Sequence, residues 1–193
     1  MRKHFSISSS PTESDFIEFT KKLTGSEFSN ALDLLEIGDW SKIDAPYGSF
    51  TFEGEFDKIT MLSGGIGITP FMSMCKYATD MKLDTKITIL YGNVTEKDTT
   101  FRGELIEMQK QNKNLRVVFA LSKPGKDWGG LTGYITSEMV KKEIPDYLER
   151  FFYTEGPPAM IKAMERLFEE IGISKEQIRM EYFAGYRLVL TPL

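Results

Sequence analysis

The strongest structural signal in this chain is Gly64-Gly65-Ile66-Gly67-Ile68-Thr69-Pro70, which follows a short apolar run at residues 59–62. An apolar, helix-like segment at residues 71–78 comes next, so the stretch is expected to join a strand to a helix. Glycines permit positive φ and close approach of a ligand to the backbone. Thr69 suits the cap of the helix, Pro70 suits its first turn, and a helix start presents N–H groups to an anion. The stretch therefore predicts a diphosphate site; the alternative is an ordinary glycine-rich turn.

This stretch departs from the common dinucleotide fingerprint G-x-G-x-x-G in two ways. Pro70 stands in place of the third glycine. The next predicted strand, residues 87–91, ends in Gly92-Asn93 without the acidic residue that usually binds a ribose. The pattern therefore indicates a nucleotide-binding family other than the common dehydrogenases.

The composition excludes several classes of protein. A net charge of −4 argues against a nucleic-acid binder, and no apolar run approaches the length of a membrane span. The single cysteine, Cys75, excludes a disulfide framework, a cysteine-based zinc site and a cysteine-ligated iron–sulfur cluster. We therefore expect a cytoplasmic protein that holds no metal and has neither nucleic acid nor a membrane as a partner.

The order of the predicted elements changes near residue 56. Residues 1–55 contain three short predicted strands and a helix, which make part of an antiparallel barrel or sandwich with open edges. Residues 56–193 alternate strands and helices, which predicts an α/β domain with a doubly wound, five-stranded parallel sheet. The early strands are expected at 3–9, 16–20 and 40–45, and the helix at 27–35. The later strands are expected near 59–63, 86–91, 115–121, 150–154 and 178–183, and the helices near 70–82, 100–111, 136–143 and 157–171.

Five blocks of the sequence resemble, in the same order, those of the ferredoxin–NADP reductase-like flavoprotein family. The blocks are residues 3–12, 25–29, 45–50, 64–70 and 155–158, and the ending at 181–186 is similar to the tail of the bacterial members. The resemblance implies a partial FAD-binding β-barrel over 1–55 and an NAD(P)-binding domain over 56–193. It also implies that a hydride passes from nicotinamide to FAD, and electrons then pass to a separate carrier such as ferredoxin or flavodoxin.

By the same resemblance, the block Lys3-His4-Phe5-Ser6 binds the flavin. Phe5 would lie against the isoalloxazine ring and Ser6 would hydrogen-bond near its N5 atom. Lys3 stands where the family has arginine, and a lysine binds phosphate without the bidentate fork, unless Arg2 substitutes. Ser29 would meet the FAD diphosphate at a helix start; simple helix capping is the alternative for Ser29, and an amphipathic strand for the first block.

The resemblance assigns the remaining candidate residues to the nicotinamide dinucleotide. Glu155 replaces the family's usual cysteine beside the nicotinamide, where it could order the nicotinamide amide or relay a proton, and Ser6 and Glu155 are the two predicted catalytic residues. The diphosphate would be bound by Gly64, Gly65, Gly67, Thr69 and Pro70. Gly156 and Pro157 would also contact the cofactor, and with Pro158 they would start the next helix. Ser122 and Lys123 would favour NADP over NAD, with Arg102 as a second cation. Solvated surface lysine is the alternative for Lys123.

The amino terminus leaves two hypotheses open. Members of the family carry roughly 40 further residues, about three strands of 5–6 residues plus turns, before the block that begins at Lys3. The chain is expected to be either a truncated version of a longer protein or a short form whose barrel a partner chain or a second copy completes. The rival to the reductase is therefore an NAD(P)-binding module, or a subunit of a split reductase, without stable flavin of its own. Tyr182 and Phe183 are expected to cover the flavin or to close the sheet.

Overall fold

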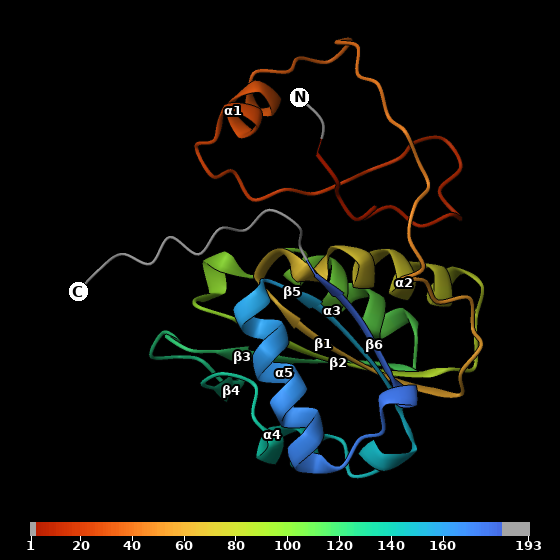
Figure 1. Ribbon diagram of the computed structural model, residues 1–193, viewed down its shortest axis with the longest axis vertical. Coiled ribbons are helices and arrows are strands. Elements are labelled where there is room, and N and C mark those ends of the chain that lie inside the picture. The colour runs from red at the N-terminus through yellow and green to blue at the C-terminus, as the bar shows by residue number, and fades with distance from the viewer. Residues whose placement is uncertain (1–2, 183–193) are drawn as a thin grey trace.

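A six-stranded parallel sheet lies at the centre of the computed structural model, which describes residues 3–182 (Figure 1). Its strands lie in the order β4-β3-β2-β1-β5-β6. They are β1 (Lys58–Gly64), β2 (Lys86–Asn93), β3 (Leu115–Leu121), β4 (Leu131–Thr132), β5 (Phe151–Gly156) and β6 (Ile178–Tyr182). The order reverses between β1 and β5, and in open α/β sheets ligands bind beyond the carboxyl ends of the strands at such a point.

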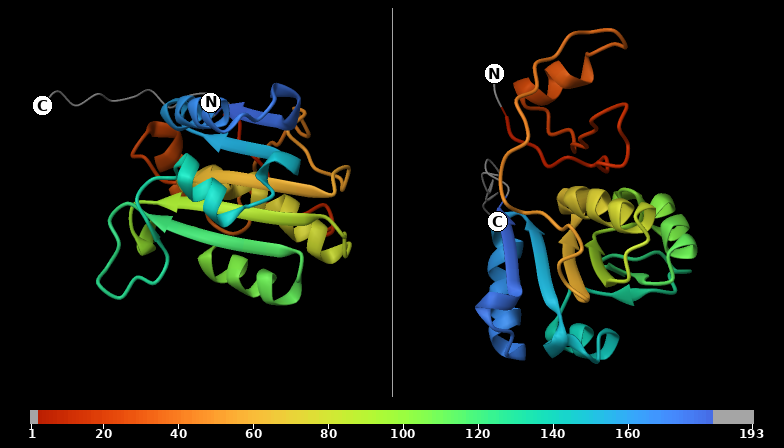
Figure 2. Two further views of the ribbon diagram at one scale, coloured as in Figure 1. Left: turned by 90° about the horizontal axis from the view of Figure 1, so that it is seen from below. Right: turned by 90° about the vertical axis from the view of Figure 1, so that its right-hand side faces the viewer.

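Helices cover both faces of the sheet (Figure 2). On one face, α2 (Thr69–Asp80) and α3 (Arg102–Gln111) bury apolar side chains such as Phe71 and Leu105 against β1, β2 and β5. On the other face, α4 (Ser137–Glu143) and α5 (Pro158–Ile171) bury Val140 and Phe168. The four short 3-10 helices are η1 (Gly65–Ile68), η2 (Glu96–Asp98), η3 (Tyr147–Glu149) and η4 (Lys175–Gln177).

The parallel sheet was predicted correctly in class but not in the number of strands. The sequence predicts five strands, and the sixth, β4, has only two residues, which pair with Ala120 and Leu121 of β3. A strand of two residues is too short to show the alternation on which a prediction from periodicity depends.

The partial barrel predicted for residues 1–55 is not present in the part of it that the structure describes. The N-terminal segment, residues 3–57, contains the helix α1 (Glu27–Asp33) and one isolated antiparallel bridge, Ile7 to Phe19, but none of the three predicted strands. A strand needs a neighbour to pair its backbone groups, and within the described residues the segments 3–9 and 16–20 pair with each other at one bridge alone. Several apolar side chains of the predicted strands are exposed, including Phe16, Ile17 and Trp40.

The N-terminal segment instead lies as a separate layer over α2 and beyond the carboxyl ends of β5 and β6 (Figure 1). The Ser73 hydroxyl of α2 donates to the Ser9 carbonyl at 2.7 Å, and the Thr12 hydroxyl donates to Asp80 at 2.5 Å. Phe50 packs edge-on against Tyr153 of β5, with ring centroids 5.5 Å apart. These contacts place the block around Ser6 over the carboxyl edge of the sheet.

A buried arginine holds together the opposite, amino edge. Arg150 donates to Asp146 at 2.8 Å, to the Ile59 carbonyl at 3.0 Å and to the Thr88 hydroxyl at 3.3 Å, so it links the starts of β1, β2 and β5. Burial opposes ionisation of Asp146, but hydrogen bonds from Arg150 and Lys58 outweigh it and lower its pKa to about 2. The amino edge is therefore a structural cluster in which each charge has a partner.

A close backbone contact fixes the glycine-rich loop on β5. A Cβ placed on Gly67 would lie 2.4 Å from the carbonyl oxygen of Glu155, closer than any real Cβ contact. Because the obstacle is backbone rather than a flexible side chain, Gly67 is required for packing and not for an unusual φ.

We expect Gly67→Ala to lower the free energy of unfolding by roughly 1–3 kcal/mol, because η1 and β5 must move apart. Gly103→Ala is the matched control, since a Cβ on Gly103 would have no neighbour within 4 Å and alanine is favoured in helices by up to about 1 kcal/mol. Urea unfolding measures both variants. Equal stability of the two variants would contradict the contact.

Candidate functional site

The glycine-rich loop lies at the carboxyl end of β1, where the strand order reverses. Each of its three glycines has a different environment. Gly65 alone has a positive φ, 55°, and a Cβ there would meet nothing within 4 Å, so the space above it is open. Gly64 has an extended φ of −139°, and its Cβ would lie 2.6 Å from the Met160 sulfur. The Tyr91 hydroxyl donates to the Gly65 carbonyl at 2.8 Å, which holds the loop against β2.

Thr69 does not cap the helix, contrary to the prediction. The 3-10 helix η1 runs directly into α2, so Thr69 is already the first residue of α2 and Ile68 occupies the cap position. The Thr69 hydroxyl is buried and donates to the Ile66 carbonyl at 2.5 Å, which directs it into the loop. Pro70 lies in the first turn of α2, as predicted. The Thr69 hydroxyl is therefore occupied, and the backbone N–H groups of the loop are what is left for the predicted anion.

Glu155 at the end of β5 is the most unusual side chain at this edge. It is 1% exposed, and its Oε1 atom accepts a hydrogen bond from the Ser6 hydroxyl at 2.7 Å. Its Oε2 atom is buried and has no hydrogen-bond partner among the described residues. Burial raises the pKa of Glu155 to about 8, the Ser6 hydrogen bond opposes this rise, and the charge of Glu181 adds to it. The carboxyl is therefore mostly protonated at neutral pH.

The structure brings together Ser6, from the first sequence block, and Glu155, from the last. The main chain of Glu155 also contacts Gly67, and a Cβ on Gly156 would lie 2.8 Å from the Met160 sulfur that also approaches Gly64. Pro157 is the residue before α5. The loop after β1 and the end of β5 are thus packed directly against each other at the carboxyl edge.

Of the other residues in the first block, Phe5 packs on neighbouring aromatic side chains and the two residues before it are exposed. The ring of Phe5 stacks on Phe19 with centroids 4.9 Å apart and also contacts Phe28 at 5.7 Å, while Lys3 and His4 are exposed. Arg2, proposed as a substitute for Lys3, lies outside the described residues, as does Phe183.

Ser29 lies at the start of α1 but is not its cap. Ser26 caps the helix, and the buried Ser29 hydroxyl accepts from the Thr24 N–H at 2.9 Å. The helix begins at Glu27, so Ser29 lies within its first turn. Its hydroxyl therefore binds the backbone of the preceding loop, and the alternative that Ser29 caps the helix is wrong, because Ser26 is the cap.

The residues predicted to select the coenzyme lie beyond the ends of β2 and β3. Ser122 and Lys123 follow β3, and their N–H groups donate to the carbonyls of Asn93 and Val94 at 2.9 and 2.8 Å. The Lys123 side chain is exposed. Arg102 lies at the start of α3, with its guanidinium 5.8 Å from the ring centroids of both Phe119 and Trp128.

Sequence reasoning missed two residues at this edge. Glu96 lies 3.6 Å from Arg102 and so partly neutralises the expected second cation. It stands three residues beyond the end of β2, near the position at which common dinucleotide-binding domains carry an acidic residue. Ser63, directly before the glycine-rich stretch, pairs in register with Glu155, and its buried hydroxyl has no hydrogen-bond partner among residues 3–182. Ser63 is the last residue of the predicted strand 59–63, and a polar residue at the carboxyl end of a parallel strand indicates a place at the ligand-binding edge of the sheet.

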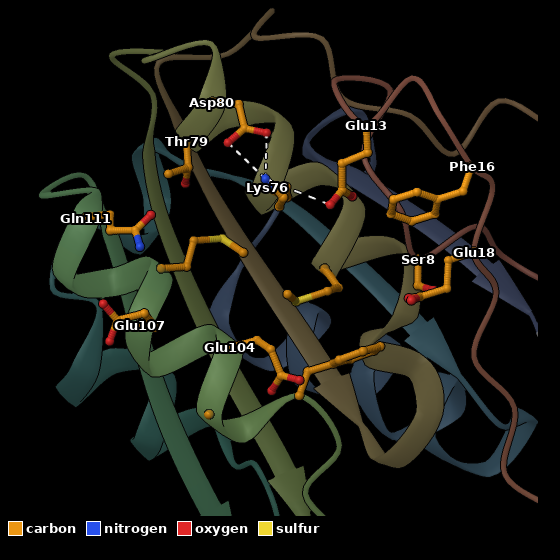
Figure 3. Close-up of a pocket in the computed structure, with 14 residues that line it drawn as sticks. Ser8, Glu13, Phe16, Glu18, Lys76, Thr79, Asp80, Glu104, Glu107 and Gln111 are labelled. Atoms are coloured by element: carbon orange, nitrogen blue, oxygen red, sulfur yellow. Dashed lines mark hydrogen bonds and ion pairs between the residues drawn. The ribbon is translucent and has the colours of Figure 1, made fainter.

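A cavity of about 640 Å³ lies elsewhere, between the N-terminal segment, α2 and α3 (Figure 3). Figure 3 shows Lys76 between Glu13 and Asp80, which neutralise it. None of the predicted site residues lines this cavity, and its other charged groups are the carboxylates of Glu18, Glu104 and Glu107. An anionic dinucleotide does not suit this lining.

Within residues 3–182, no helix is long and apolar enough to span a membrane. In the same range, no group of three or more histidine, cysteine, aspartate or glutamate residues is placed to bind a metal ion. The roles assigned to individual site residues remain predictions.

Known proteins share both the sequence pattern and the fold. The profile of the oxidoreductase NAD-binding domain matches residues 61–166. The chain is 30% identical over 183 residues to NADH-cytochrome b5 reductase 1 of Aspergillus terreus, covering 91% of this chain and 62% of the relative. It is 29% identical to the glycine betaine monooxygenase reductase subunit of Chromohalobacter salexigens, covering 95% of this chain and 51% of the relative. The chain therefore spans about half to three fifths of the length of these curated relatives.

Among solved structures, the cytochrome b5 reductase domain of Ulva prolifera nitrate reductase superposes with a TM-score of 0.74 at 27% identity. The match covers 91% of this chain and 71% of that domain. The similarity thus extends over the N-terminal segment as well as the sheet.

We expect Glu155→Gln to remove a pH dependence of stability. Folding raises the pKa of Glu155 from 4.5 to about 8, so the folded state keeps a proton that the unfolded state releases between these values. The free energy of unfolding of the wild type therefore falls as pH rises from about 4.5 to 8, and the loss persists above pH 8. Glu155→Gln cannot ionise, so over this range it should gain on the order of a few kcal/mol relative to the wild type.

Urea unfolding at several pH values measures this difference, and Glu169→Gln on α5 corrects for the loss of one charge. If the free energies of unfolding of Glu155→Gln and the wild type differ by the same amount at every pH from 5 to 8, Glu155 ionises normally and the prediction is wrong.

Proposed function

Because the chain belongs to the oxidoreductase NAD-binding domain family of ferredoxin–NADP reductase-like proteins, we propose that it binds NAD(P)H and passes its hydride to FAD. Electrons would then pass to a separate carrier, such as ferredoxin or flavodoxin. The observation that carries the proposal is the 2.7 Å hydrogen bond between Ser6 and Glu155. It joins the flavin motif to the strand end where the nicotinamide is expected, so the two rings would meet at these side chains.

The dinucleotide fits the loop after β1. The open space above Gly65 and the start of η1 and α2 suit a diphosphate, because backbone N–H groups at a helix start lack intrahelical partners. The coenzyme's nicotinamide would extend toward Glu155 and its adenosine toward the ends of β2 and β3. There the exposed Lys123 supports NADP, while the neutralisation of Arg102 by Glu96 supports NAD.

FAD fits less completely. Ser6 is placed beside the nicotinamide end, which supports a flavin there, but Phe5 is stacked on Phe19 and the Ser29 hydroxyl is used by Thr24. These two contacts favour a second candidate, an NAD(P)-binding module or split-reductase subunit whose flavin is held by another chain. In either case, FAD would supply the acceptor of the hydride, and Ser6 and Glu155 would position it.

We also propose that a β-rich partner, either another chain or a second copy, covers the exposed apolar side chains of the N-terminal segment. Ile37 and Trp40 are exposed, at 110% and 82%, and large apolar side chains in such number mark an interaction surface. The isolated bridge between Ile7 and Phe19 supports this proposal, because extended segments that pair at a single bridge have backbone groups to which added strands would bind.

The visible absorption spectrum of the purified protein distinguishes the two candidates. A flavin band that bleaches on anaerobic addition of NADH or NADPH is the expected result for the reductase. A colourless protein that takes up no FAD but still binds coenzyme would contradict the reductase for this chain alone and support the binding module.

A charge placed in the open space above Gly65 tests the diphosphate site. Asparagine and aspartate both tolerate the positive φ at this position, so Gly65→Asn and Gly65→Asp should fold alike. We expect the aspartate variant to bind NADH or NADPH at least about tenfold more weakly than the asparagine variant, because its carboxylate would lie beside the diphosphate. Isothermal titration measures both affinities; equal affinities would place the diphosphate elsewhere.

A further inference from the structure

The acidic cavity, the hollow of about 640 Å³ between the N-terminal segment, α2 and α3, has carboxylates on two opposite walls. Glu104 and Glu107 of α3 form one wall, and Glu13 and Glu18 of the N-terminal segment form the other (Figure 3). Both glutamates of α3 are exposed, so the mouth of the cavity is open to solvent. Like charges that line a hollow raise the negative potential inside it and attract cations.

The protein itself neutralises only part of this charge. Among the described residues that line the cavity, Lys76 is the one basic side chain, and it lies 2.8 Å from Asp80 and 4.0 Å from Glu13. The carboxylate of Glu104 makes no hydrogen bond or ion pair within residues 3–182. A positively charged partner would therefore find carboxylates that still lack a counter-charge.

The floor of the cavity is apolar. Met72 of α2 and Met108 of α3 line it and are buried, together with Phe101, the residue that precedes α3. Methionine side chains are flexible and adapt to different apolar partners. A hollow of this volume lies within the roughly 300–1,000 Å³ that is typical of binding pockets. The lining thus suits an occupant that has an apolar face as well as positive charges.

The lining also follows the period of a helix on both α2 and α3. The residues that face the cavity recur at i, i+4 and i+7: Met72, Lys76 and Thr79 on α2, and Glu104, Met108 and Gln111 on α3. Each helix therefore presents one stripe, about 10 Å long at roughly 1.5 Å per residue. A third helix in this groove would place its own i, i+3 and i+4 side chains at the same spacing.

We propose that the acidic cavity is the docking site for a basic amphipathic helix of a partner protein. The apolar face of that helix contacts Met72 and Met108, and its lysine or arginine side chains pair with Glu104 and Glu107. Complementary charge supports this occupant, and an amphipathic helix in a groove is a common mode of recognition. The surface is separate from the carboxyl edge of the sheet, so the inference does not depend on the proposed function.

Fluorescence anisotropy with three labelled peptides tests this proposal. Each peptide has about 14 residues and is roughly 21 Å long as a helix. The first carries leucine on one face and lysine on the other, the second has glutamate in place of lysine, and the third has serine in place of leucine. The protein variants are Glu104→Gln/Glu107→Gln and, as the matched control, Glu169→Gln/Glu176→Gln, which removes two exposed carboxylates outside the cavity.

We expect the wild type and the control variant to bind the leucine–lysine peptide with affinities within about twofold of each other. Glu104→Gln/Glu107→Gln should bind it about 3- to 10-fold more weakly, because two ion pairs are lost. For the wild type, the other two peptides should bind at least about tenfold more weakly than the first, one through charge repulsion and the other through lost apolar burial.

The same affinity in the two double variants would place the peptide elsewhere on the surface and overturn the proposal. Equal binding of the serine–lysine and leucine–lysine peptides would also overturn it, because the apolar floor would then have no role. Failure of the wild type to bind the leucine–lysine peptide would overturn it as well, and spermidine titrated in place of the peptide would show whether the cavity takes a small polycation instead. None of these results bears on the binding of NADH or NADPH.

Discussion

The approach of Gly67 to the carbonyl of Glu155 is the contact on which the carboxyl edge of the sheet depends. A side chain at Gly67 would lie 2.4 Å from that oxygen, so the loop after β1 can pack on β5 only with glycine there. This packing brings the start of α2, which suits a diphosphate, next to the end of β5, which carries a buried carboxyl. A nucleotide that lies over the point where the strand order reverses would contact both.

Glu155 connects this edge to the N-terminal segment. Its hydrogen bond to Ser6 joins residues 149 positions apart, and its burial makes the carboxyl mostly neutral at pH 7. A neutral carboxyl can be buried between two parts of the chain without the cost of an unpaired charge. A glutamate is therefore compatible with a place close to a reacting ring, where it can donate or accept a hydrogen bond.

The sequence was sufficient for the parallel sheet and for the position of the glycine-rich loop, because both depend on local periodicity and on glycine and proline at fixed positions. It was not sufficient for the barrel over residues 1–55, since strands such as 3–9 and 16–20 need neighbours and form here only the bridge between Ile7 and Phe19. Nor could it find the partners of side chains: Thr69 turns into the loop, Glu96 reaches Arg102, and Ser63 lies beside Glu155 only through strand register. Such pairings depend on tertiary structure, which no local pattern contains.

We expect the coenzyme to bind at the carboxyl edge of the sheet and not in the acidic cavity between the N-terminal segment, α2 and α3. Hydrogen–deuterium exchange with and without saturating NADH or NADPH tests it most directly, because both regions are read in one experiment. We expect the coenzyme to slow exchange of backbone amides in residues 64–69 and 155–160 and to leave exchange in residues 101–111 unchanged. Slower exchange at 101–111 without any change at 64–69 would contradict it.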